Sequence, residues 1–251
     1  MHEQLWFTQI LNNLFAGPVT ASLLALHIQP KYPDAPIPNS TAMEFLVFLF
    51  LLLMFVLLRS RLSVDKPGAL QHMFEGWHGF IDGQAHEIIG HGSEKFTAYL
   101  AALGFFILFC NLLGLIPGFD SPTGFPVVPL GCAVLTFVYY HYQGLKKQGV
   151  AHYLRHFAGP SIGSWVANIA MGCLMVPIEI VSHLARMLSL TVRLYANMFA
   201  GDMVTMVFFS LIPIGLPILF MLLHLGVSVI QTYVFVLLAM IYLQGAVAEE
   251  H

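Results

Sequence analysis

The sequence predicts an all-α integral membrane protein with about five membrane-crossing helices, an amphipathic surface helix and a long, strongly tilted hairpin at the end. Of its 251 residues, 58% are hydrophobic and only 9% are charged, whereas a soluble domain carries roughly 25% charged residues. The mean hydropathy is +0.78, and apolar runs long enough to cross a bilayer recur along the chain. The net charge of −3 comes from short loops without a basic patch, so no nucleic-acid partner is predicted.

Residues 1–41 are predicted to form a separate segment on the outer side of the membrane. Its apolar run, Leu14 to Ile28, is broken by Gly17 and Pro18. No Lys or Arg precedes Lys31, so the signal-peptide pattern is missing. An interfacial helix lying on the membrane is one interpretation of this run. The polytopic membrane domain then comprises residues 42–251.

Three shorter spans and a surface helix are predicted in the first part of the membrane domain. The spans are residues 42–58, 96–116 and 127–145, and a short turn-rich loop separates the last two. Between the first and second spans, residues 69–89 read as an amphipathic helix that lies along the bilayer surface. The residues expected on its apolar face are Leu70, Phe74, Trp77 and Ile81.

Two much longer apolar stretches follow, residues 162–211 and 216–247. As helices they would be about 75 and 48 Å long, since a helix rises about 1.5 Å per residue, whereas the hydrocarbon core is about 30 Å thick. Either each stretch is broken, with Pro177 the obvious point in the first, or the helices are strongly tilted. Pro213, Gly215 and Pro217 mark the turn of this hairpin.

The basic residues predict the orientation. If the spans alternate, one side receives only Lys31, while Arg186 and Arg193 lie inside the fourth span. The N-terminus is therefore expected outside and the C-terminus in the cytoplasm. The basic residues on the cytoplasmic side are Arg59, Arg61, Lys66, Lys95, Lys146, Lys147 and Arg155.

The fourth span carries a polar stripe, which is unusual because a charged side chain at the bilayer centre costs about 2.5 to 3.5 kcal/mol. Arg193 has no acidic residue within four positions, so its counter-charge is expected to come from another element. Snorkelling at the interface is an alternative explanation for Glu179 and Arg186. The stripe, at steps of three or four residues, consists of Glu179, Ser182, Arg186, Ser189, Arg193 and Asn197, and Gly201 extends it.

The fifth span places His224, Ser228 and Gln231 on one face. When the hairpin is folded at Pro213, Asp202 and His224 are equally far from the turn, and Arg193 and Gln231 are nearly so. The pairs Asp202–His224 and Arg193–Gln231 are therefore predicted at matching depths. An aspartate–histidine pair titrates in an accessible pH range, which suits a proton relay entered from outside.

The sequence LSLTVRLYANMFAGD at residues 188–202 closely resembles the signature of the a subunit of F-type ATP synthases. Further matches are NLLGLIP at residues 111–117 and the spacing from His224 to Gln231. The resemblance extends over the chain from about residue 40. Asp202 stands where many bacterial members have glutamate, which makes the acid one methylene shorter.

This resemblance implies a non-catalytic, proton-translocating stator subunit in the bacterial inner membrane. Its implied partners are the c-subunit ring, the b-subunit peripheral stalk, other ATP synthase subunits and lipid, and it implies no cofactor or metal. Asp202 and His224 would belong to an outer half-channel and Glu179 and Ser182 to a cytoplasmic one, with Arg193 between them. The candidate proton-translocation residues are Arg193, Asn197, Asp202, His224, Gln231, Glu179 and Ser182.

Parts of the sequence are also compatible with two other functions. A secondary transporter could use the same intramembrane charges, but such folds usually contain inverted repeats, and no convincing repeat is visible. The sequence His86-Glu87-Ile88-Ile89-Gly90-His91 is similar to a zinc-protease motif, but its histidines are five positions apart instead of four. Cys110, Cys132 and Cys173 lie in apolar stretches and are interpreted as packing residues.

Overall fold

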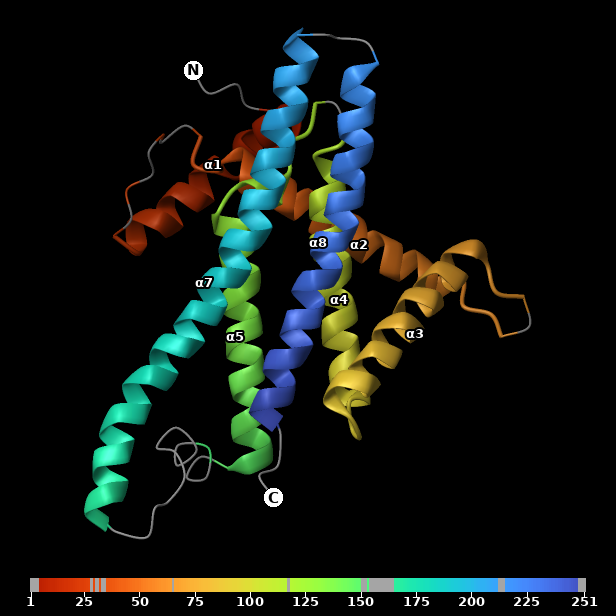
Figure 1. Ribbon diagram of the computed structural model, residues 1–251. Coiled ribbons are helices and arrows are strands. Elements are labelled where there is room, and N and C mark those ends of the chain that lie inside the picture. The colour runs from red at the N-terminus through yellow and green to blue at the C-terminus, as the bar shows by residue number, and fades with distance from the viewer. Residues whose placement is uncertain are drawn as a thin grey trace.

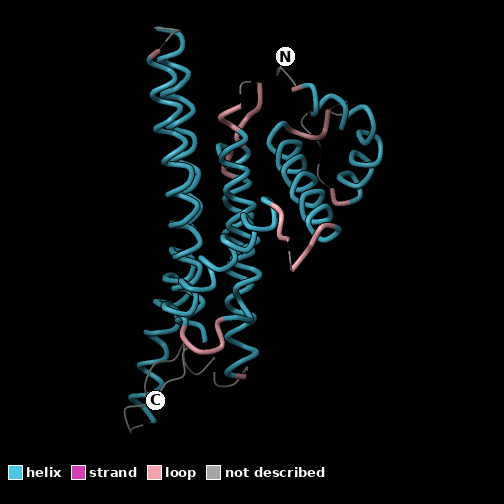
Figure 2. The backbone as a smooth tube through the Cα atoms, turned by 90° about the vertical axis from the view of Figure 1, so that its right-hand side faces the viewer, coloured by secondary structure: helices cyan, strands magenta, loops and turns pink. Residues whose placement is uncertain are grey.

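The computed structural model describes residues 5–27, 29, 32, 35–64, 66–116, 118–149, 153, 165–211 and 215–247. In these ranges the chain forms α-helices and one short 3-10 helix, and it contains no strand (Figures 1 and 2). The predicted all-α membrane fold is confirmed. Lys31, Pro117, Arg155, Pro213 and the C-terminal residues 248–251 lie outside the described residues.

The N-terminal half begins with three helices, α1 (Trp6–Ala25), α2 (Asn39–Ser60) and α3 (Ala69–Ile89). Helix α1 continues through Gly17 and Pro18, so the expected break is wrong. A proline inside a helix removes one backbone hydrogen bond. The adjacent turn still forms, and the Ser22 hydroxyl donates to the Pro18 carbonyl at 2.9 Å.

The Asn12 side chain ties helix α1 to the segment just before α2. The Asn12 amide donates to the carbonyl of Ile37 at 3.1 Å, and the Ile37 N–H donates back to the Asn12 carbonyl oxygen at 3.0 Å. Asn12 thus satisfies both backbone groups of a residue that lies just before a helix. This reciprocal pair fixes the chain between α1 and α2.

The central helices are α4 (Glu94–Leu113) and α5 (Val127–Gln148), joined through the 3-10 helix η1 (Pro122–Gly124). The hairpin consists of α7 (Trp165–Leu211) and α8 (Leu216–Val247). The bounds of α8 are those predicted. Helix α4 ends at Leu113, three residues earlier than predicted, because the chain turns there towards η1.

Helix α7 passes through Pro177 without a break, so the alternative of a broken helix is wrong, and its tilt in the bilayer stays a prediction. Figure 1 shows α7 inclined against the bundle, with its N-terminal end far from α4. Helix α8 packs against α4, α5 and α7 and therefore forms the centre of the bundle.

Four described helices are long and apolar enough to cross a membrane, namely α2, α4, α7 and α8. Helix α5 corresponds to the third predicted span, residues 127–145, and does not reach the same hydropathy, because residues 139–143 read YYHYQ. Its 22 residues would still measure about 33 Å, which matches the hydrocarbon core. Five crossings therefore remain a prediction.

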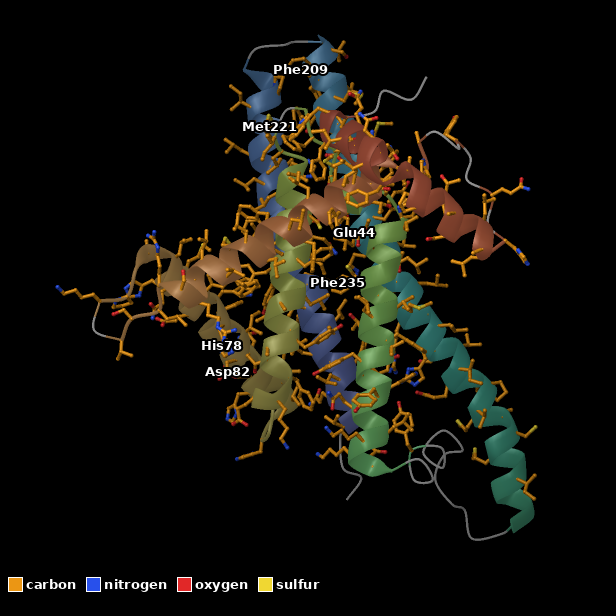
Figure 3. All side chains as sticks on the ribbon, turned by 180° about the vertical axis from the view of Figure 1, so that it is seen from behind. Glu44, His78, Asp82, Phe209, Met221 and Phe235 are labelled. Carbon is orange, nitrogen blue, oxygen red and sulfur yellow. The ribbon has the colours of Figure 1, made fainter. Side chains whose placement is uncertain are left out.

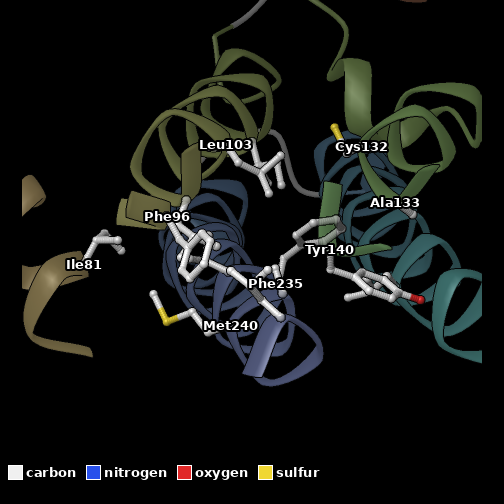
Figure 4. Packing of buried hydrophobic residues seen from close by; sticks show 14 of the residues in the cluster. Ile81, Phe96, Leu103, Cys132, Ala133, Tyr140, Phe235 and Met240 are labelled. Atoms are coloured by element: carbon white, nitrogen blue, oxygen red, sulfur yellow. The ribbon is translucent and has the colours of Figure 1, made fainter. Parts of the chain in front are cut away.

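The main core contains side chains from α3, α4, α5, α7 and α8 (Figure 4). Phe235 of α8 is fully buried at its centre, and Ile81 of α3 and Tyr140 of α5 belong to the same cluster. The predicted apolar face of α3 is confirmed for Phe74, Trp77 and Ile81. Leu70 was also expected there and is exposed, since it lies in the first turn of α3, before the helix meets α4.

Helices α3 and α4 approach closely where Trp77 meets Gly104. The indole N–H of Trp77 donates to the carbonyl of Ala101 at 3.0 Å. A Cβ at Gly104 would lie 2.6 Å from the Trp77 ring and 3.1 Å from Val236. Gly104 therefore lets the indole lie against the backbone of α4.

We expect Gly104→Ala to destabilise the protein by about 1–3 kcal/mol, because overpacking a filled contact has costs of this size. The matched control is Gly131→Ala on α5, where a Cβ would meet nothing within 4 Å. Both changes gain the same helix propensity, so their difference isolates the clash. Thermal unfolding in detergent measures it, and equal stabilities of the two variants would contradict this packing.

Candidate functional site

A cleft of about 560 Å³ opens near the turn end of the α7–α8 hairpin. Phe209 and Met221, which line it, lie close to that turn in Figure 3. Its walls come from the segment after α4, beginning at Gly114, and from η1, α7 and α8. We call it the turn-end cleft. Its polar lining residues are Asp120, Ser121, Thr205, Asp202 and His224.

Asp202 and His224 meet inside the turn-end cleft, as the hairpin register predicts. The distance from His224 Nδ1 to Asp202 Oδ1 is 3.7 Å. The His224 side chain is only 3% exposed, whereas that of Asp202 is 36% exposed. The carboxylate thus faces the opening, and the imidazole lies behind it within the protein.

Two glycines make room for this pair. A Cβ at Gly201 would lie 2.7 Å from His224 Nδ1, so the imidazole rests directly on the backbone of α7. A Cβ at Gly124 of η1 would lie 3.1 Å from Asp202 Oδ2. Asp202 is therefore held between the His224 ring and η1. The Nε2 atom of His224 is buried and has no hydrogen-bond partner among the described residues.

Deeper in the same seam, Gln231 is buried and accepts a hydrogen bond from the Asn197 amide at 2.5 Å. Arg193 was predicted to lie opposite Gln231, and the observed partner is one helical turn nearer the hairpin turn. Asn197 and Arg193 are each two positions away from exact register with Gln231, so the distance from the turn alone does not choose between them. Between the two polar pairs, the Ser228 hydroxyl points to the sulfur of Met198 at 3.8 Å.

Arg193 is exposed on α7. Its neighbour Leu194 is fully buried, so the two side chains point to different sides of the helix. Among the residues that the structure describes, no ion pair or hydrogen bond to Arg193 is found. The guanidinium is charged at any physiological pH, so an exposed arginine in a membrane helix calls for water or an external counter-charge.

Glu179 and Ser182 lie towards the other end of α7, each half-buried. Glu179 Oε1 is 3.2 Å from His183 Nε2, and His183 Nδ1 is 2.8 Å from the hydroxyl of Tyr140 on α5. Arg186 stacks over the ring of Tyr242 of α8 at 5.6 Å. Polar groups thus lie at two places along α7, at Glu179 and Ser182 and at Asp202 in the turn-end cleft. Arg193 lies between these two places.

Sequence reasoning did not assign a role to Asn111, which is fully buried and connects α4, η1 and α8. Its amide donates to the Ser228 carbonyl at 3.2 Å and to the Thr232 hydroxyl at 3.1 Å. Its carbonyl oxygen accepts from Thr123 at 2.6 Å. Asn111 therefore holds η1 against α8 beside Asp202. An asparagine inside an otherwise apolar span is the sequence signal that could have revealed it.

Asp120 was also missed, although it lines the turn-end cleft with Asp202. The Asn39 amide donates to its carboxylate at 3.4 Å, so the start of α2 supports this side of the cleft. In the described part of the chain, no cluster of three His, Cys, Asp or Glu residues could hold a metal ion.

The comparisons with known proteins agree with these features. The family model "ATP synthase A chain" matches residues 41–244. ATP synthase subunit a of Koribacter versatilis is 55% identical over 251 residues and covers 100% of both chains. ATP synthase subunit a of Solibacter usitatus is 49% identical over 220 residues, which are 87% of this chain and 91% of the relative. That of Geobacter sulfurreducens is 39% identical over 226 residues, covering 90% and 93%.

These matches extend over the turn-end cleft, Arg193 and the whole hairpin. They favour the ATP synthase family over the alternative of a secondary transporter. The long apolar helices and the family together make this a multi-pass membrane subunit that takes part in proton transport and ATP synthesis. The chain belongs to the ATP synthase subunit a family.

Proposed function

We propose that this chain forms two offset aqueous half-channels against a rotating c-subunit ring, with Arg193 separating them. The observation that carries the proposal is the exposed, unpaired position of Arg193 on α7 between two polar ends. One end is the turn-end cleft with Asp202 and His224. The other contains Glu179 and Ser182. An exposed arginine between them needs water or an external counter-charge, and a carboxylate on each ring subunit fits that need.

In this mechanism protons enter the turn-end cleft from outside and reach the ring through Asp202 and His224. Both nitrogens of the His224 imidazole can exchange protons. The half-exposed Asp202 carboxylate connects this imidazole to water in the cleft. Gln231 and Asn197, which are hydrogen bonded, lie between this pair and Arg193 along the hairpin. They can orient the arriving carboxylate through amide groups that carry no charge.

Arg193 would hold each arriving ring carboxylate in its ionised form without releasing a proton itself. The proton lost at that point leaves through the cytoplasmic half-channel at Glu179 and Ser182. The driving force is partly electrical, at about 2.3 kcal/mol per charge per 100 mV. ATP chemistry takes place on other subunits, and the b-subunit peripheral stalk holds this chain still while the ring turns.

The same proposal fixes the orientation. The turn between α7 and α8 lies outside, and the N-terminus lies on the same side. The C-terminus lies in the cytoplasm, and so do Arg59 in the last turn of α2 and Arg61 directly after that helix. Positive residues are enriched in cytoplasmic loops, which supports this direction.

We expect Arg193→Ala to abolish both proton-driven ATP synthesis and ATP-driven pumping. It should also permit passive proton flow through the membrane sector, because nothing then separates the half-channels. Arg193→Lys should fail as a coupler as well, since a lysine is more strongly hydrated and loses its proton more readily when buried. Vesicles carrying the membrane sector measure the flux, and the whole complex measures synthesis under an imposed gradient.

The control for this test is Arg61→Ala, which removes an exposed arginine from the loop after α2 and should leave coupled synthesis near the parent rate. Sustained coupled synthesis by Arg193→Ala would contradict the mechanism. A loss of synthesis without passive flow would contradict the role of Arg193 as the barrier between the half-channels.

We expect the losses caused by Asp202→Ala and His224→Ala to be non-additive, because the two groups form one relay. The exchange of Asp202→His with His224→Asp should restore part of the synthesis rate. His72→Ala and Glu75→Ala, which remove the same kinds of group from exposed positions of α3, serve as controls without effect. Fully additive losses with no rescue would indicate two independent sites.

A further inference from the structure

A chain of three hydrogen-bonding side chains joins α5 to the polar stripe of α7 at the end away from the hairpin turn. The Tyr140 hydroxyl lies 2.8 Å from His183 Nδ1. The other ring nitrogen, Nε2, lies 3.2 Å from Glu179 Oε1, one helical turn earlier on α7. Each nitrogen of the imidazole thus faces a different oxygen.

Burial increases along this chain from Glu179 to Tyr140. The Glu179 side chain is 33% exposed, that of His183 is 10% exposed, and Tyr140 is 3% exposed. The carboxylate therefore faces the opening, while the histidine and the tyrosine are fixed by the protein. The Tyr140 ring stacks on the His183 ring at 5.7 Å between centroids, which restrains the imidazole further.

This arrangement selects one tautomer of His183. An ionised Glu179 carboxylate only accepts hydrogen bonds, so Nε2 must carry a proton and donate it. A neutral imidazole then has a free lone pair on Nδ1, and the Tyr140 hydroxyl donates to it. The opposite tautomer would place two acceptors against each other at Glu179. Tyr140 thereby holds the donor that Glu179 requires.

Other titratable and charged groups surround the imidazole on each side. From α5, the His141 ring lies 4.6 Å from the His183 ring, and its Nδ1 is 2.9 Å from the hydroxyl of Tyr153. From α7, Arg186 adds a positive charge one turn beyond His183. From α8, Tyr242 lies under that guanidinium. Glu179 is the one carboxylate that this cluster contains among the described residues.

We propose that His183 and Tyr140 are positioning residues that hold the Glu179 carboxylate in place for proton release. The proposal rests on the assignment of Glu179 to the cytoplasmic half-channel and goes beyond it, since neither residue belongs to the predicted stripe. His183 fixes one carboxylate oxygen by a charge-assisted hydrogen bond. The second oxygen stays free to exchange protons with water.

The test uses the complete ATP synthase in inverted vesicles, with ATP-driven pumping measured against the pH on the cytoplasmic side. His183→Leu and Tyr140→Phe should each lower the rate about three- to tenfold and move the optimum to higher pH, because the ionised carboxylate loses its oriented donor. The double variant should be no slower than His183→Leu, since both changes break one chain. His183→Gln should recover much of the rate, because its amide N–H can replace the Nε2 donor.

The matched control is Tyr139→Phe, which removes a hydroxyl from the adjacent position of α5. Tyr139 stacks on Tyr99 at 3.8 Å between centroids and takes no part in the chain to Glu179. Its rate and pH profile should equal those of the parent. Copurification with the ring shows for each variant that the complex has assembled.

Glu179→Gln separates this inference from the proposed function. If it slows pumping while His183→Leu and Tyr140→Phe leave rate and pH profile unchanged, the positioning role is wrong and the half-channel stands. If Glu179→Gln pumps at the parent rate, both the half-channel assignment and the positioning role are wrong. Equal losses in His183→Leu and His183→Gln without a shift in pH would indicate a purely structural histidine, which also overturns the proposal.

Discussion

The polar interior of this protein depends on the close approach of α7 and α8 at Gly201. The His224 ring occupies the place that any side chain at Gly201 would need, and this brings Nδ1 to within 3.7 Å of the Asp202 carboxylate. The same seam continues through Ser228 and Met198 to Asn197 and Gln231. The lipid offers no hydrogen-bond partners to a polar side chain. The polar groups of this seam therefore find their partners on the facing helix. Asn111 and η1 cover it from the α4 side.

Arg193 is the group that this seam does not satisfy. It lies on the exposed side of α7, while Leu194 and Met198 face the interior and are fully buried. A membrane helix tolerates such a charge when water or an opposite charge reaches it. In the proposed mechanism, the two polar ends of α7 supply water from opposite sides of the membrane, and a carboxylate on the moving ring supplies the charge. With its 47 residues, α7 is longer than an upright helix that crosses one bilayer, so its exposed side is longer as well.

Much of the fold followed from the sequence because apolar length and helical periodicity are strong signals. The bounds of α8 and the Asp202–His224 pair were predictable, since two residues equally far from a turn meet in an antiparallel hairpin. The Asn197–Gln231 contact was not, because Asn197 and Arg193 differ equally, by two positions, from the distance of Gln231 to Pro213, so the distance from the turn does not choose between them. The chain from Tyr140 to His183 could not be found either. A single histidine in an apolar helix carries no signal for a partner 43 positions away on another helix.

The central claim is that the side of α7 that bears Arg193 faces the ring, and disulfide crosslinking tests it most directly. In a background without Cys110, Cys132 and Cys173, Ala196→Cys would be combined with a cysteine next to the ring carboxylate in the assembled complex. Ala196 is exposed, whereas Met198, two positions along, is fully buried against the hairpin seam. The account predicts rapid crosslinking of Ala196→Cys to the ring and none for Met198→Cys. Crosslinking of Met198→Cys in preference to Ala196→Cys would show that another side of α7 faces the ring and would contradict the account.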